Sequence, residues 1–139
     1  MLAVVLALAQ RRPEAFAWTL AADVVAELAS DVLKAVIPRP RPHLDPLVPV
    51  PHTHSFPSGH ATTSFACATV LAWAEPRLRL PLYVLAAAVA WSRVYVGVHY
   101  PVDVLAGALL GLAVGRFVLT ALPRLAGGRL RRPRGPRAG

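Results

Sequence analysis

The sequence contains few cysteines and few charged residues. Its 139 residues include one cysteine, Cys67, so no disulfide bond can form within the chain. Charged residues make up only 16% of the sequence and just seven are acidic, whereas hydrophobic residues make up 55%. Mean hydropathy is therefore positive. This composition disfavours an ordinary soluble domain and indicates a membrane protein.

The net charge of +8 could indicate a nucleic-acid-binding protein, but the basic residues are not distributed for that purpose. Their largest cluster follows an apolar segment near the C-terminus, as at the cytoplasmic end of a membrane span. We therefore expect no nucleic-acid partner. The cluster consists of Arg124, Arg129, Arg131, Arg132, Arg134 and Arg137.

Four apolar segments predict an all-α fold, a transmembrane helical bundle with four core spans. Met1–Gln10 would add a helix stub of about 15 Å, too short to span a bilayer. It lacks the basic residues and cleavage site of a signal peptide. Residues 1–123 would form the membrane core, and residues 124–139 a basic, disordered cytoplasmic tail. The four spans are expected at Glu14–Ile37, Ala61–Ala74, Pro81–Val98 and Val102–Leu122, with Pro123 ending the last helix.

The charge distribution predicts an orientation for this bundle. If the tail is cytoplasmic, eleven of the fifteen basic residues lie on the cytoplasmic side. This bias agrees with the positive-inside rule. The opposite, outer side then receives the proline-rich segment Pro38–Pro57, which contains seven prolines and is expected to be a loop.

Two helical patterns predict how the helices pack. Asp23, Glu27, Ser30 and Lys34 fall within about 60° on the first span, as one polar stripe. Such a stripe occurs on a soluble amphipathic helix, but among apolar spans it is expected to face the bundle interior. The last span carries a smooth ridge along which another helix can approach closely. The ridge consists of Gly107, Gly111 and Gly115.

Three short segments carry residues suited to a phosphate ester. Catalysis on such an ester needs cations and N–H donors around the phosphate, a nucleophile in line, and an acid for the leaving oxygen. In this order and spacing the segments resemble the signature of the type 2 phosphatidic acid phosphatase superfamily, which includes membrane lipid phosphatases, soluble acid phosphatases and vanadium haloperoxidases. The resemblance covers residues 14–122. The segments are Lys34-x6-Arg41-Pro42, Pro57-Ser58-Gly59-His60 and Ser92-Arg93-x5-His99-x3-Asp103.

Three cations are candidates for a phosphate clamp: Lys34, Arg41 and Arg93. The planar guanidinium of arginine can bind two oxygens at once, and lysine adds a point charge. Arg39 also precedes a proline. The six-residue gap from Lys34 selects Arg41, so Arg39 is expected to be a secondary contact at best.

The second segment opens a helix, where Ser58 can be read simply as an N-cap. A helix N-terminus with a glycine also presents N–H groups that suit an anion. The resemblance implies that the Ser58 side chain and the Gly59 backbone bind phosphate. It assigns His60 to the general acid, a role that histidine can perform near neutral pH.

The third segment supplies the expected nucleophile. The resemblance implies that His99 attacks phosphorus and forms a phosphohistidine. Asp103 would hold the other nitrogen of the imidazole, as in a catalytic triad. A purely structural account explains Asp103 as a first-turn helix residue, but it leaves His99 and Arg93 unexplained.

His52 and His54, with His43 nearby, form a pattern that could bind a metal ion. No carboxylate or cysteine set accompanies them, so no metal site is predicted. We expect this loop to shape substrate entry instead.

The resemblance therefore implies a metal-independent hydrolase, without a cofactor, that acts on a lipid phosphate or diphosphate. It would lie in a bacterial cell membrane with its active site on the extracytoplasmic face. Phosphatidic acid, phosphatidylglycerol phosphate and polyprenyl diphosphates all remain open as substrates, because the motifs read only the phosphate. A catalytically inactive lipid-phosphate-binding protein is the alternative, and a haloperoxidase is disfavoured because those relatives are soluble and much larger. Pairing into a homo-oligomer is open.

Overall fold

The computed structural model describes residues 13–42, 47–49 and 52–125. All regular elements within these ranges are helical, which confirms the all-α prediction for the described part of the chain. The predicted N-terminal stub, His43 and residues 126–139 of the predicted tail lie outside the described residues. The elements in chain order are α2 (Pro13–Val36), α3 (Gly59–Ala74), the short 3₁₀ helix η1 (Pro76–Leu78), α4 (Arg79–Tyr95) and α5 (Pro101–Leu125).

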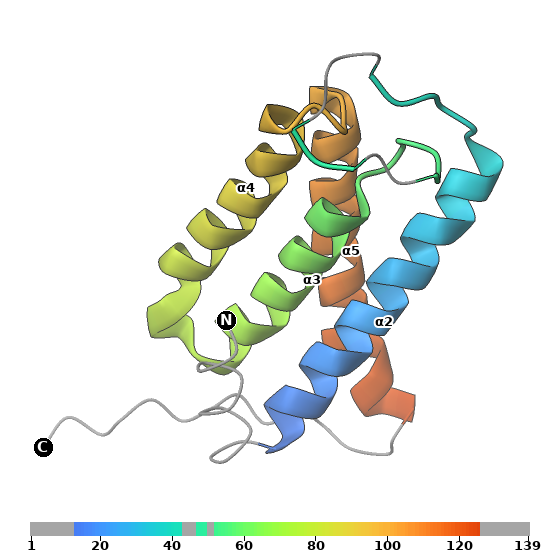
Figure 1. Cartoon of the computed structure of the whole chain (residues 1–139). Coiled ribbons are helices and arrows are strands. Elements are labelled where there is room, and N and C mark those ends of the chain that lie inside the picture. Colours follow the sequence, from blue (N-terminus) through green and yellow to red (C-terminus); the bar gives the residue numbers. More distant parts are fainter. Residues whose placement is uncertain (1–12, 43–46, 50–51, 126–139) are drawn as a thin grey trace, which may run out of the picture.

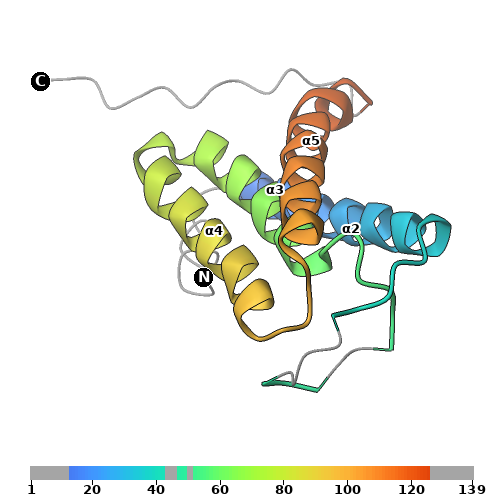
Figure 2. The ribbon, with the colours of Figure 1, turned by 90° about the horizontal axis from the view of Figure 1, so that it is seen from above.

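Helix α3 is the central element, and α2, α4 and α5 all pack against it (Figure 2). The chain runs up and down, so α2 and α4 end where α3 and α5 begin (Figure 1). The α2–α3 loop and the α4–α5 loop therefore meet at one end of the bundle. This topology brings all three sequence motifs to the same end.

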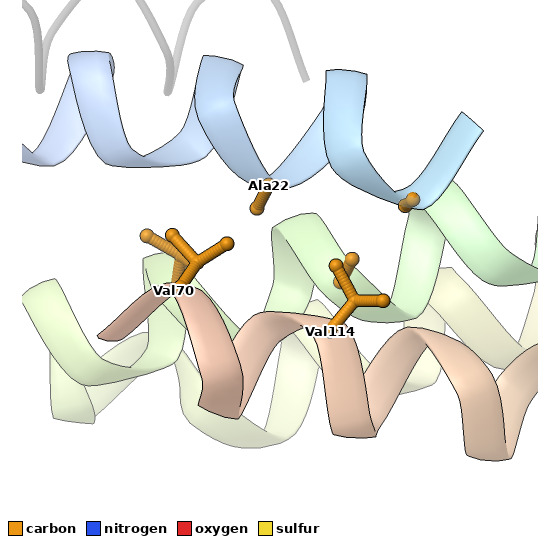
Figure 3. Packing of buried hydrophobic residues seen from close by; sticks show 6 residues of the cluster. Ala22, Val70 and Val114 are labelled. Atoms are coloured by element: carbon orange, nitrogen blue, oxygen red, sulfur yellow. The ribbon is translucent and has the colours of Figure 1, made fainter. Parts of the chain in front are cut away.

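Small side chains let the helices approach closely. The core between α2, α3 and α5 is made of alanine and valine, with Ala22, Val70 and Val114 gathered in Figure 3. Because these fully buried residues are small, the backbones can pack at short distance, as is common between helices in membranes. Larger side chains such as Trp18 and Leu110 are only partly buried against this core.

The predicted glycine ridge is where α5 meets α3. A Cβ atom on Gly107 would lie 2.6 Å from the Ser58 carbonyl oxygen, and one on Gly111 would collide with the Thr62 carbonyl oxygen. Both neighbours are backbone atoms, which cannot move aside without moving α3. The ridge was predicted from its four-residue spacing, and the structure confirms it.

Two predicted helix ends are wrong. The last helix does not stop at Pro123 but continues to Leu125. A proline near the C-terminus of a helix removes only one hydrogen bond, and its fixed φ is helical. Helix α4 ends at Tyr95 rather than Val98, because Gly97 adopts a φ of 77° that turns the chain.

Among the described residues, one helix is long and apolar enough to cross a bilayer. It is the stretch Pro101–Ala121 of α5. Helix α2 has 24 residues but carries the polar stripe, and α3 and α4 have 16 and 17 residues.

Candidate functional site

A cavity of about 380 Å³ opens at the end of the bundle where the motifs meet. It receives residues from α2, α3, α4 and both loops. The two histidine rings expected to act on phosphate lie in this one cavity, together with all three expected clamp cations. The predicted site residues that line it are Lys34, Arg41, Gly59, His60, Arg93 and His99.

The polar stripe of α2 forms one wall of this cavity, as its spacing predicted. Asp23, Glu27, Ser30 and Lys34 all line it. The Lys34 ammonium also donates a hydrogen bond to Asp31 at 2.9 Å. Ser30 is fully buried, and its hydroxyl has no hydrogen-bond partner among the described residues.

Arg41 ties the proline-rich loop to the loop that carries His99. Its Nε donates to the Thr53 carbonyl at 2.9 Å, and one terminal nitrogen donates to the Val98 carbonyl at 2.9 Å. The same nitrogen lies 3.3 Å from His99 Nε2. Burial lowers the pKa of the Arg41 guanidinium, while the Asp103 carboxylate acts in the opposite direction. These contacts hold the arginine beside the imidazole.

His99 is presented by the turn that ends α4. Gly97 turns the chain, and Pro101 then starts α5, so the histidine sits between two helices. The ring is buried, with 6% of the residue exposed. Its Nδ1 lies 3.7 Å from Asp103 Oδ2, too far for a hydrogen bond, and has no hydrogen-bond partner in the described part of the chain.

The surroundings of His99 keep its imidazole neutral. Burial, followed by the positive charge of Arg41, lowers the pKa of His99 to about 4. The nearby Ser55 backbone and the Asp103 carboxylate raise the pKa, but by less. A neutral ring keeps the free lone pair that a nucleophile needs.

The lowered pKa of His99 predicts that its ring resists protonation in mildly acidic solution. Because the folded-state pKa of His99 is about 4, the ring should stay neutral as the pH falls from 7 to 5. An ordinary histidine would be half protonated near pH 6.5. NMR of ring-labelled histidines, with His99→Ala used to assign the signal, should show the His99 ring titrating with a midpoint near pH 4. A transition near pH 6.5 would contradict this electrostatic description.

Asp103 lies behind His99 and is completely buried. Its Oδ2 accepts a hydrogen bond from the Tyr100 backbone N–H at 2.9 Å. Its Oδ1 accepts one from Arg39 Nη1, also at 2.9 Å. Asp103 therefore lies near the imidazole but outside the cavity, and the expected contact with its other nitrogen is a 3.7 Å approach and not a hydrogen bond.

Arg39 has a partner that the sequence analysis did not identify. It was expected to be a secondary phosphate contact at best; its side chain does not line the cavity and pairs with Asp103. Its guanidinium also stacks on the Tyr100 ring, 4.4 Å from the centroid. The sequence did contain one indication of this ion pair, because a carboxylate expected inside the bundle needs a cation to compensate its charge.

Ser58 is placed beside the start of α5 and does not line the cavity. Its backbone N–H donates to the Asp103 carbonyl at 3.0 Å, which joins the first turn of α3 to that of α5. Its side chain makes no cap hydrogen bond, and the buried hydroxyl has no partner within the described ranges. The side chain therefore does not act as an N-cap, and its hydroxyl is left unpaired among the described residues.

Two further polar residues support the site. Ser92 accepts a hydrogen bond from Arg93 Nε at 3.1 Å, which orients that cation. The His54 ring lies 3.0 Å from the Lys34 carbonyl oxygen, so it joins the α2–α3 loop to the end of α2. The sequence analysis included Ser92 in the third motif without a role of its own and associated the loop of His54 with substrate entry.

Comparison with known proteins adds relatives of similar sequence. A 42% identical stretch of 94 residues matches the undecaprenyl-diphosphatase of Sulfolobus acidocaldarius and covers 63% of this chain and 46% of that protein. The decaprenylphosphoryl-5-phosphoribose phosphatase of Mycobacterium tuberculosis is 39% identical over 118 residues, which is 81% of this chain and 64% of that one. The chain thus spans about half to two thirds of the length of these relatives.

Solved structures share the fold. LpxE of Aquifex aeolicus superposes with a TM-score of 0.76 and 31% identity, over 85% of this chain and 74% of that one. A transmembrane PAP2-type phosphatidylglycerolphosphate phosphatase of Bacillus subtilis gives a TM-score of 0.67 and 28% identity, over 96% and 69%. The model of the PAP2 superfamily matches residues 2–126, nearly the whole sequence. The chain belongs to the PAP2 superfamily.

Proposed function

We propose that this protein is an integral-membrane phosphatase that hydrolyses a lipid phosphate or diphosphate through a phosphohistidine on His99. One observation carries the proposal: three cations and two histidine rings line a single cavity large enough for a phosphate group. The relatives, which are phosphatases named for polyprenyl and phospholipid substrates, support the same chemical class.

The outer surface of the bundle supports a membrane location. Large apolar side chains are exposed on three helices. Those of α2 recur every four residues and so form one outward-facing stripe. A surface of this kind suits lipid chains rather than water. On α2 the face consists of Leu20, Val24, Leu28 and Val32, on α4 of Val84, Leu85 and Trp91, and on α5 of Leu105, Leu109 and Phe117.

By composition, one of the described helices is apolar enough to span a bilayer. The placement of the charged residues supports four spans. Three of the ionisable residues that make α2 look too polar to span, Asp23, Glu27 and Lys34, line the cavity. Of the others, Glu14 lies in the first turn of the helix, and Asp31 is exposed and pairs with Lys34. Inward-facing charges of this kind are tolerated within a bundle. We propose that α2, α3, α4 and α5 all cross the bilayer, with the cavity at the extracytoplasmic face and the C-terminus in the cytoplasm.

In the first proposed step, His99 Nε2 attacks phosphorus. A phosphate held by Lys34, Arg41 and Arg93 would place the imidazole in line with the leaving oxygen. The P–O bond to the lipid breaks as the P–N bond forms, and His60 gives its proton to the departing oxygen. Arg41 would exchange its contact with the Nε2 lone pair for one with a phosphate oxygen.

In the second proposed step, water attacks the phosphohistidine. Neutral His60 takes a proton from the water, the P–N bond breaks, and inorganic phosphate leaves. His99 is then neutral again, and His60 again carries the proton it lost in the first step. Asp103 stabilises the cationic ring of the intermediate through charge, since it lies 3.7 Å from Nδ1.

Phosphate release tests this function directly. We expect the purified full chain in detergent micelles to release phosphate from one or more of undecaprenyl diphosphate, phosphatidic acid and phosphatidylglycerol phosphate, with EDTA present throughout. Because the proposed steps use only side chains of this chain, the chelator should not reduce the rate. Binding of orthovanadate without any turnover would instead favour a catalytically inactive lipid-phosphate-binding protein.

Ser58 should show opposite effects on stability and activity. Its buried hydroxyl has no partner among the described residues, so Ser58→Ala removes an unsatisfied polar group and should not lower the melting temperature. If the hydroxyl turns to phosphate, the same variant should lose about 10-fold in kcat/KM, the equivalent of one hydrogen bond to a charged group.

Ser55→Ala is the matched control. Ser55 is equally buried, but its hydroxyl donates to the Pro40 carbonyl at 3.0 Å. Its removal should therefore destabilise the protein by about 1 kcal/mol. Thermal unfolding in detergent and initial rates would separate the two variants. Equal destabilisation by both would contradict the assignment of Ser58 to the ligand.

A further inference from the structure

We propose that Arg39 is a positioning residue for catalysis: it holds the Asp103 carboxylate behind His99 and does not bind phosphate. This inference rests on the proposed function of the site. It divides the Arg39-Pro40-Arg41-Pro42 segment between two tasks, with Arg41 on the cavity side of the imidazole and Arg39 on the far side.

The first observation is the burial of Asp103. Its side chain is 0% exposed, so its negative charge needs compensation inside the protein. Arg39 Nη1 donates to Oδ1 at 2.9 Å, and the Tyr100 backbone N–H donates to Oδ2 at 2.9 Å. Arg39 is the cation of the ion pair that Asp103 makes with an arginine or lysine in the described structure.

The second observation is that Arg39 is itself held in place. Its guanidinium covers the Tyr100 ring at 4.4 Å from the centroid. Its backbone carbonyl accepts a hydrogen bond from the N–H of Ser55, a fully buried residue, at 2.9 Å. The charge is therefore fixed relative to the start of α5 and cannot swing freely toward the cavity.

The third observation is the contrast with Arg41. Both are arginines followed by proline, but only Arg41 lines the cavity and lies 3.3 Å from His99 Nε2. Arg39 acts on the other ring nitrogen, through Asp103, whose Oδ2 is 3.7 Å from Nδ1. Two cations thus flank the imidazole, and each acts on a different nitrogen.

The two arginines provide matched variants for kinetics. Arg41→Gln should raise KM and weaken inhibition by inorganic phosphate by about 10-fold or more, because a charged contact with phosphate is lost. Arg39→Gln should leave phosphate inhibition within about 3-fold of the parent and lower kcat by about 10-fold or more, as expected when an orienting partner is removed. Arg39→Lys, which keeps the charge, should recover part of kcat.

The pH profile separates positioning from a merely structural role. The charged or titratable groups around His99 come from every element at the site: Arg41 from the loop, His60 from α3, Arg93 from α4, Asp103 from α5, and Asp23, Glu27 and Lys34 from α2 across the cavity. Removing the Arg39 charge leaves Asp103 free to stabilise imidazolium, so the acid limb of kcat/KM should move to higher pH by about one unit. Substrate ionisation is common to parent and variant and cancels in the comparison.

A double-mutant cycle covers the case in which Arg39→Gln folds poorly. Arg39→Gln combined with Asp103→Asn leaves no buried charge unpaired, so this protein should fold. In the Asp103→Asn background, Arg39→Gln should change kcat by less than about 3-fold. The inference fails if Arg39→Gln weakens phosphate inhibition as Arg41→Gln does, if its acid limb stays in place, or if its loss of kcat is as large without Asp103. An inactive parent protein would instead refute the proposed function.

Discussion

His99→Ala should reduce phosphate release from lipid substrates by about 10⁴-fold or more, the size of loss seen when the nucleophile of a catalytic unit is removed. The reason is geometric. Nε2 of this ring lies 3.3 Å from Arg41 in the phosphate-sized cavity, and burial keeps the ring neutral with a pKa of about 4. Initial rates with the parent and the variant in the same detergent would measure the loss.

The variant should still bind the anion. Lys34, Arg41 and Arg93 remain in place, so orthovanadate should still protect His99→Ala against thermal unfolding. His52→Ala is a suitable control, since His52 is an exposed residue of the α2–α3 loop that does not line the cavity. Its activity should match the parent. Loss of less than about 10-fold in His99→Ala would mean that this ring does not attack phosphorus.

Gly111→Leu should have the largest effect on the fold. A Cβ atom alone at this position would collide with the Thr62 carbonyl and come within 3.0 Å of the Ala66 backbone nitrogen. Because both are atoms of α3, α5 has to move away, at a cost of about 3 kcal/mol. The shift would also move Asp103, so activity should fall by about 100-fold.

Cys67 offers a measurement of this effect. It is the one cysteine of the sequence and is 7% exposed, so its reaction with a maleimide dye reports opening of the bundle. Gly111→Leu should label at a much lower temperature than the parent protein. Ala113→Leu, on the exposed face of the same helix, should label like the parent. If the two variants behave alike, the close approach of α3 and α5 is not what holds the bundle together.

The sequence anticipated most of the fold because its signals were local or periodic. The polar stripe ending at Lys34 and the glycine ridge through Gly111 each follow from helical spacing, and both lie where that spacing predicted. Helix ends were less certain. Pro123 was wrongly predicted to end the last helix, which continues to Leu125 because a proline close to a helix C-terminus removes only one backbone hydrogen bond.

The sequence predicted which residues line the site better than it predicted their hydrogen-bond partners, because those partners are set by long-range contacts. Six residues of the motifs line one cavity. The pairing of Arg39 with Asp103 joins positions 64 residues apart, and no local pattern encodes it. The five side-chain contacts of Arg41 are likewise set by how the two loops fold over each other, as with Thr53 and Val98. Spacing identified the residue types, but only the packed loops determine their partners.

The most direct test is to look for phosphate on His99 itself. The full chain turning over a lipid phosphate would be stopped in alkali, in which phosphohistidine survives, and its peptides examined by mass spectrometry. We predict one phosphate on the peptide that contains His99, during turnover of the parent protein and never in His99→Ala. Phosphate on a different residue, or an active enzyme without any phosphorylated peptide at every reaction time, would contradict the mechanism.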